Sequence, residues 1–105
     1  MSVPLSTLDV RDRLEIERIF APVFGRDANA RIKLFGSRAR GDAHRSSDID
    51  IALISPLGIS AAEISALREA LEESRVPFRI DLVNYATVSP ELRTAIDNEG
   101  ITWPA

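Results

Sequence analysis

The chain has 105 residues, of which 45% are hydrophobic and 28% are charged, a composition typical of one compact domain. Its formal net charge of −3 argues against a protein that binds nucleic acid mainly by neutralising backbone phosphates, so we expect no direct nucleic-acid binding. The absence of cysteine excludes disulfides and thiolate metal sites. We therefore predict a single domain over residues 1–105, and a nucleotide stays open as a small ligand.

The start of the chain carries no targeting signal that the sequence reveals. Residues 1–6 lack the basic cluster and long apolar run of a secretory signal, and no apolar stretch approaches the ~20 residues needed to cross a bilayer. We therefore expect a cytoplasmic protein without a membrane partner. A domain of this size keeps only about 5–15 kcal/mol of net stability, so a partner interface or a homo-oligomer would help it.

The first predicted element is a helix that follows a cap at Ser6 or Thr7 and ends at Gly25. Asp9 lies in its first turn, where a negative charge is favourable. Its apolar residues recur at helical spacing and predict one broad stripe: Val10, Leu14, Ile16, Ile19, Phe20, Val23 and Phe24.

Two strands and a second helix are predicted next. Residues 30–35 alternate apolar and charged side chains, the pattern of a half-buried strand. Residues 48–54 predict another strand, acidic at its start and more buried toward its end. A helix over residues 60–74 begins with a capping box, in which Ser60 is the cap and Glu63 follows three residues later.

The last third of the chain completes an α/β pattern. Residues 78–84 predict a third strand, and Ser89 followed by Pro90 is typical of a helix start. Residues 101–103 predict a short edge strand, in which Trp103 covers the core or, as the alternative, anchors a partner. The element order predicts an α/β (α+β) sandwich, with helices on one or both faces of a small mixed β-sheet.

Three aspartates carry the strongest chemical signal. Asp48 and Asp50 lie two residues apart on a predicted strand, so their carboxylates point to the same face. Like charges at this spacing repel, and a hard divalent cation with oxygen ligands is the usual solution. Asp81, on the third predicted strand, also faces away from the core. If the two strands are adjacent, the three carboxylates meet in a cluster that suits Mg²⁺ bound together with phosphate oxygens.

A glycine turn supplies the complementary half of the predicted site. Gly36 allows a sharp bend, and Ser37 offers a hydroxyl and an amide N–H at a short helix start, which together suit a triphosphate. Arg38 and Arg40 add positive charge. Residues two apart on a helix do not share a face, so we expect one of these arginines to contact phosphate directly, and either could.

The runs Leu-Phe-Gly-Ser-Arg-Ala-Arg-Gly (34–41) and Ser-Asp-Ile-Asp-Ile (47–51) resemble the signature of the DNA polymerase beta-like nucleotidyltransferase superfamily, and of its minimal nucleotidyltransferase (MNT) branch in particular. The runs 79–83 and 96–100 are also similar to that branch, so the resemblance covers nearly the whole chain. It implies the palm fold of that superfamily. It also implies metal-dependent transfer of a nucleoside monophosphate from a nucleoside triphosphate to a hydroxyl, with one or two Mg²⁺ ions.

The resemblance implies a role for each motif residue. Gly36 and Ser37 would bind the triphosphate, Asp48 and Asp50 would hold the metal, and Asp81 would be a third ligand and a candidate general base. Minimal members resemble the antitoxin half of two-gene systems whose partner is a helical HEPN-type ribonuclease toxin. Some attach AMP to a tyrosine of that partner, so the resemblance implies AMPylation of a partner protein from ATP.

Other interpretations of the same residues stay open. Asp48 and Asp50 could be the solvated face of an edge strand, and Asp81 a simple salt-bridge partner. The chain could neutralise its partner by occlusion without catalysis, or could modify a small molecule such as an aminoglycoside. Asp42 and His44 are interpreted as loop residues outside the site. One charged set is interpreted as the solvated side of a helix: Arg68, Glu69, Glu72, Glu73 and Arg75.

Overall fold

A mixed sheet of four strands forms the centre of the part that the computed structural model describes, residues 8–40 and 48–103. The strands are β1 (Arg31–Phe35), β2 (Ile49–Ile54), β3 (Ile80–Asn84) and β4 (Ile101–Trp103). Their order in the sheet is β3-β2-β1-β4, so β3 and β4 are the edge strands. β1 pairs antiparallel with β2 and with β4, whereas β3 runs parallel to β2.

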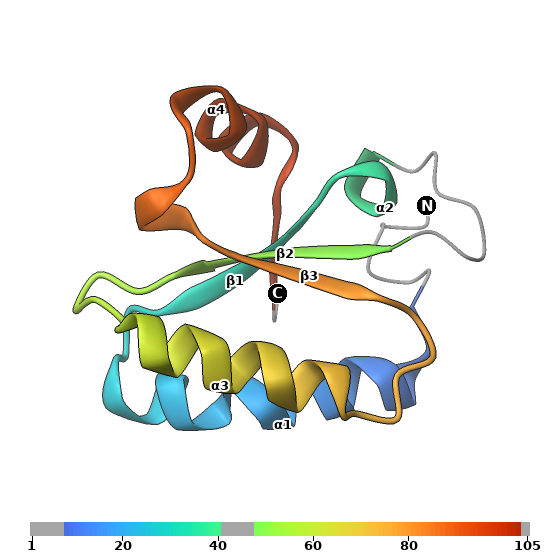
Figure 1. Ribbon diagram of the computed structural model, residues 1–105. Helices are drawn as coiled ribbons and strands as arrows, with labels where there is room; N and C mark the ends of the chain where they lie inside the picture. The colour runs from blue at the N-terminus through green and yellow to red at the C-terminus, as the bar shows by residue number, and fades with distance from the viewer. Residues whose placement is uncertain (1–7, 41–47, 104–105) are drawn as a thin grey trace.

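Helices cover both faces of this sheet. They are α1 (Val10–Arg26), α2 (Ser37–Arg40), α3 (Ala61–Glu72) and α4 (Pro90–Glu99), with the 3-10 helix η2 (Tyr85–Thr87) ahead of α4. Figure 1 shows α1 and α3 together on one face, α4 on the other, and the short α2 at the end of β1. The predicted α/β sandwich around a small mixed sheet is confirmed. None of the helices within the described residues is long and apolar enough to cross a membrane.

Alternation along the strands divides the interior into two cores. Ile49 and Ile51 of β2 are fully buried in the larger core, against α1 and α3. The residues between and after them, Asp50 and Ala52, therefore face α4. The smaller core on that side contains Phe35, Ala52 and Ile96, with Val83, Tyr85, Val88 and Leu92 packed against it. This smaller core lies further along β2 and β3 than Asp50 and Asp81. It therefore leaves the acidic starts of these two strands uncovered.

The first helix differs from its prediction at its start. Asp9 is the cap, because its carboxylate accepts the Arg11 backbone N–H at 2.8 Å. The predicted cap at Ser6 or Thr7 is therefore wrong, and both residues lie outside the described ones. The prediction that Val10 and Leu14 belong to the buried stripe is also wrong. The two side chains are 56% and 58% exposed; Leu14, for example, precedes the buried Ile16 by two residues, about 200° around the helix. The stripe that is buried consists of Ile16, Ile19, Phe20 and Val23.

The later helix boundaries agree closely with their local signals. The Ser60 hydroxyl accepts the Glu63 backbone N–H at 3.1 Å, and the Glu63 carboxylate accepts the Ser60 backbone N–H at 3.2 Å, so the capping box is confirmed. The helix ends at Glu72, slightly before the predicted end. Ser89 caps α4 by accepting the Leu92 backbone N–H at 3.2 Å, with Pro90 as the first helical residue.

Trp103 closes the core beneath the last strand. Its side chain is 1% exposed, and its indole N–H donates to Glu17 Oε2 at 2.9 Å. The prediction that Trp103 covers the core is confirmed.

The chain reaches β4 through Gly100, where a Cβ would lie 2.3 Å from the Ile96 carbonyl oxygen. A glycine is thus needed for the tight passage from α4 into the sheet.

Arg68 has a structural contact that its interpretation as a solvated charge missed. Its Nε and Nη2 donate to the Leu82 carbonyl oxygen at 3.2 and 3.0 Å. The contact ties α3 to the outer edge of β3, an edge that no strand covers within the described residues. Because Leu82 directly follows Asp81, this contact also steadies the strand that carries the third aspartate.

Asp27 is a buried carboxylate that joins the end of α1 to the loop after β2. It is 1% exposed, and its oxygens accept the Leu57 backbone N–H at 3.0 Å, the Ser55 hydroxyl at 2.8 Å and the Asn29 backbone N–H at 3.0 Å. The Leu57 hydrogen bond, followed by those from Ser55 and Asn29, holds the pKa of Asp27 below its ordinary value against the opposing effect of burial. The charged form of Asp27 therefore stabilises the fold.

Replacing Asp27 with Asn should lower the melting temperature at neutral pH, because the amide offers one acceptor oxygen where the carboxylate uses two. The folded-state pKa lies below the unfolded value of about 3.9, so this stabilisation is present above that value and is lost as the pH falls through the folded pKa. Thermal unfolding followed by circular dichroism should show the gap between wild type and Asp27→Asn shrinking on acidification. Glu72→Gln, on the exposed side of α3, is the control, and a gap independent of pH would contradict the account.

Candidate active site

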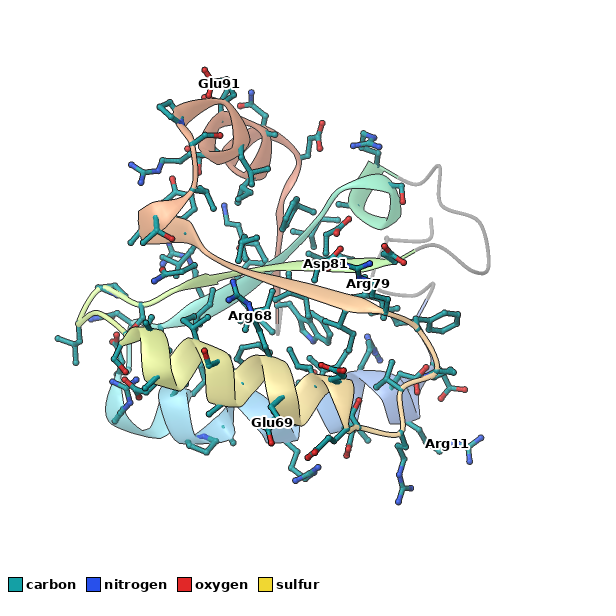
Figure 2. All side chains as sticks on the ribbon, in the orientation of Figure 1. Arg11, Arg68, Glu69, Arg79, Asp81 and Glu91 are labelled. Atoms are coloured by element: carbon teal, nitrogen blue, oxygen red, sulfur yellow. The ribbon has the colours of Figure 1, made fainter. Side chains whose placement is uncertain are left out.

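Two of the three predicted aspartates, Asp50 and Asp81, lie on the face of the sheet that α4 partly covers. Asp50 of β2 stands directly opposite Asp81 of β3 in the parallel pairing, so the expectation that these strands are adjacent is confirmed. Both point away from the core that Ile49 and Ile51 fill. Asp48 directly precedes β2 and is exposed. Figure 2 shows Asp81 on β3, on the side of the sheet toward α2.

The negative charges of the neighbouring aspartates act on Asp50. Burial of this half-buried carboxyl raises its pKa, and the negative charges of Asp81 and Asp48 raise it further, while the positive charge of Arg40 opposes the shift. The carboxylates of Asp81 and Asp48 are therefore close enough to destabilise the ionised form of Asp50. A cation placed among them would relieve that repulsion.

The glycine turn lies against the same carboxylate. Gly36 follows Phe35, which pairs with Asp50 across β1 and β2, and its φ of +76° belongs to the left-handed region that glycine favours. A Cβ on Gly36 would lie 2.3 Å from Asp50 Oδ2. The backbone N–H groups of Ala39 and Arg40 donate to the Gly36 carbonyl oxygen at 3.1 and 3.0 Å, which turns the chain into α2. The lack of a side chain thus allows turn and carboxylate to share one small space.

Of the two arginines predicted near phosphate, Arg40 is the one whose side chain is described. Its Nη1 donates to Glu99 Oε1 at 3.2 Å, so it bridges α2 to the end of α4. Its charge also acts on Asp50. Arg38 belongs to α2, but its side chain lies outside the described part. Which arginine contacts phosphate stays a prediction, as do the phosphate roles of Gly36 and Ser37.

The donor set fits a divalent cation in its chemistry, because it consists of carboxylate oxygens held near one another. The fit is incomplete in geometry. Among residues 8–40 and 48–103, no three Asp, Glu or His side chains are gathered closely enough to hold a metal ion together. Asp81 is engaged by another group, since its Oδ1 accepts a hydrogen bond from Arg79 Nε at 3.2 Å.

Arg79 is the site residue that the sequence interpretation missed. It precedes Asp81 by two residues, the same spacing that predicted a common face for Asp48 and Asp50, so the alternation rule could have found it. Figure 2 shows Arg79 and Asp81 side by side at the start of β3.

A groove of about 510 Å³ runs beside Asp81, between β3 and the end of α3. Arg79 and Asp81 contribute to its lining together with the apolar side chains of Val76 and Phe78. Arg68 lines it as well, next to its contact with Leu82. The side chain of Asp81 itself is 41% exposed.

A glycine turn that faces aspartates on two adjacent strands of a small mixed sheet defines a nucleotidyltransferase domain. Residues 21–102 match the family described as polymerase beta nucleotidyltransferase, and the chain belongs to that family.

Two curated relatives are named as adenylyltransferases. A Haemophilus influenzae protein, named probable protein adenylyltransferase MntA, is 42% identical over 62 residues, which cover 59% of this chain and 54% of that protein. This chain therefore aligns with about half the length of that relative. A Methanocaldococcus jannaschii protein, named as a candidate protein adenylyltransferase, is 32% identical over 87 residues, covering 83% of this chain and 92% of that protein.

Solved structures with the same fold include two kinds of protein. One is a toxin–antitoxin with AMP-PNP, at 27% identity and a TM-score of 0.63 over 82% of this chain and 70% of that one. Another is described as a candidate minimal nucleotidyltransferase, at 27% identity and a TM-score of 0.63 over 85% of this chain and 89% of that one. The predicted palm fold and the resemblance to the minimal nucleotidyltransferase branch are confirmed.

The close contact between Gly36 and Asp50 can be tested against a second glycine. Gly36→Ala and Gly58→Ala both place a side chain at a left-handed position, with φ of +76° and +89°, which costs about 1–2 kcal/mol. A Cβ at Gly58 meets nothing within 4 Å, whereas one at Gly36 meets the Asp50 carboxylate. We expect both variants to lose stability in urea unfolding, and Gly36→Ala alone to lose binding of a fluorescent ATP analogue.

Nucleotide binding by Gly36→Ala as tight as that of Gly58→Ala would contradict this assignment of the turn. The paired design separates the two effects, because the backbone strain is common to both variants and the clash with the carboxylate is specific to one.

Proposed function

We propose that the chain is a metal-dependent adenylyltransferase that moves AMP from ATP to a tyrosine hydroxyl of a helical HEPN-type partner, as the antitoxin of a toxin–antitoxin pair. The observation that carries the proposal is the register of Asp50 against Asp81, next to the Gly36 turn. The names of the two curated relatives support the reaction, and the toxin–antitoxin solved with AMP-PNP supports the nucleotide and the partner.

Asp48 and Asp50 are the residues that would hold the metal, with Asp81 as the third ligand. When bound, one or two Mg²⁺ ions offset the charge of the carboxylates and of the triphosphate oxygens. The half-burial of Asp50 limits the water around its carboxylate and so strengthens its interaction with positive charge. The remaining steps are triphosphate binding and acceptance of the hydroxyl proton, and both are carried out by groups of the chain itself.

The turn binds the triphosphate in this proposal. Gly36 lets the backbone approach the phosphates closely, and the Ser37 hydroxyl and amide N–H at the start of α2 donate to phosphate oxygens. Arg40, whose charge already acts on Asp50, or Arg38 offsets phosphate charge. These contacts orient the α-phosphorus toward β3.

Asp81 is the general base of the proposed reaction. Its carboxylate accepts the proton of the tyrosine hydroxyl while the tyrosine oxygen attacks the α-phosphorus, and the bond to the β-phosphate breaks to release pyrophosphate. A base in hydrogen-bonding reach of the hydroxyl contributes about 10²–10⁴-fold. The Asp81 side chain is 41% exposed, so an acceptor can reach that carboxylate. ATP and Mg²⁺ are abundant in the cytoplasm, the compartment that the sequence predicts.

A second candidate is a non-catalytic antitoxin that neutralises its partner by occlusion. The ion pair of Arg79 with Asp81 favours it, since that contact engages the residue that would act as base. The two candidates differ in one observable, which is whether the partner gains mass.

The test is a transfer assay with Mg²⁺, each nucleoside triphosphate and the protein encoded by the neighbouring gene, scored by mass spectrometry. We expect one AMP added from ATP, and a loss of about 100-fold or more in Asp48→Asn, Asp50→Asn and Asp81→Asn. Asp50→Asn should keep or raise the melting temperature, because its raised pKa means that the charged carboxylate destabilises the fold. Glu91→Gln, at the far end of α4 in Figure 2, should transfer normally.

Two results would count against catalysis. Transfer retained by an Asp48→Asn, Asp50→Asn double variant would exclude these carboxylates as metal ligands. A tight complex in which the partner gains no mass with any nucleotide would favour occlusion.

A further inference from the structure

The contact between Arg79 and Asp81 puts a positive charge of the chain on the third carboxylate of the site. Arg79 Nε donates to Asp81 Oδ1 at 3.2 Å, and the two side chains are 75% and 41% exposed. Arg79 directly precedes β3, so the pair forms along one strand and needs no other element to bring it together. The guanidinium therefore offsets the negative charge of Asp81, the same charge that a bound cation would offset.

Geometry connects this pair with the incomplete metal site. Asp81 stands opposite Asp50 in register. Even so, the described residues contain no three acidic or histidine side chains close enough to share one ion. One of the three predicted ligands is held by an arginine, whose positive charge opposes a cation at the same carboxylate and whose hydrogen bond fixes the orientation of that carboxylate.

We propose that Arg79 is a positioning residue that competes with the divalent cation for Asp81. In the free chain it holds the carboxylate, and it must release Asp81 before this residue can join Asp48 and Asp50 around the metal. The inference rests on the proposed function and adds to it a control on how the metal site is assembled.

Release of Asp81 is easy in physical terms. An exposed ion pair favours its bound arrangement by a factor of up to about five, because water competes for both partners. Arg79 also lines the groove beside β3, which gives its side chain open space on leaving the carboxylate. Arg79 therefore weakens metal binding without preventing it.

The test is Mn²⁺ binding to the full chain without nucleotide, measured by the electron paramagnetic resonance signal of free Mn²⁺. Arg79→Ala should bind Mn²⁺ about fivefold more tightly than wild type. Arg75→Ala is the matched control, since it removes the same charge from a residue that acts on Glu15 of α1. Its affinity should remain close to that of wild type. In an Asp81→Asn background, Arg79→Ala should have no effect, because the contested carboxylate is gone.

Unchanged or weaker Mn²⁺ binding by Arg79→Ala would overturn the proposal, as would equal tightening in Arg75→Ala or tightening that persists with Asp81→Asn. A different result would contradict the proposed function itself: an Asp48→Asn, Asp50→Asn double variant that binds Mn²⁺ as tightly as wild type does. Thermal unfolding of each variant shows whether an altered affinity comes from an altered fold.

Discussion

The contact between the Gly36 backbone and the Asp50 carboxylate is the constraint on which the site depends. There is no space for a Cβ between them, so the turn after β1 can bring its backbone directly to the acidic start of β2. The antiparallel pairing of Phe35 with Asp50 holds the turn in place, and the parallel pairing of β2 with β3 brings in Asp81. Three segments that are distant in sequence therefore converge on one end of the sheet.

The same arrangement explains how a small domain combines a charged site with a stable interior. Alternation along β2 sends Ile49 and Ile51 into the larger core while Asp50 faces the other way. The smaller core fills the α4 side further along the strands and leaves their acidic starts accessible. Burial of Asp50, and after it the negative charges of Asp81 and Asp48, raise its pKa, so the charged form of this carboxyl opposes folding.

The sequence predicted those features that depend on neighbouring residues. The capping box of Ser60 and Glu63 is a local hydrogen-bond pattern, and the burial of Ile49 and Ile51 opposite Asp50 follows from strand alternation. Features that depend on tertiary packing could not be predicted in the same way. The exposure of Leu14 reflects which side of α1 meets the sheet. Asp81 approaches Asp50 only because β2 and β3 are adjacent, and the sequence could not show that these two strands pair. The contact of Arg68 with β3 joins two elements that no local pattern connects.

The most direct test of the account is a crystal structure of the chain with Mn²⁺ and AMP-PNP, in which anomalous scattering locates the metal. The account predicts Mn²⁺ bound by Asp48 and Asp50, with Asp81 as a further ligand, and the phosphates of the analogue on the Gly36–Ser37 turn. Arg79 should then have left Asp81. Phosphates bound elsewhere on the molecule, or aspartates without metal while the nucleotide is bound, would contradict the account.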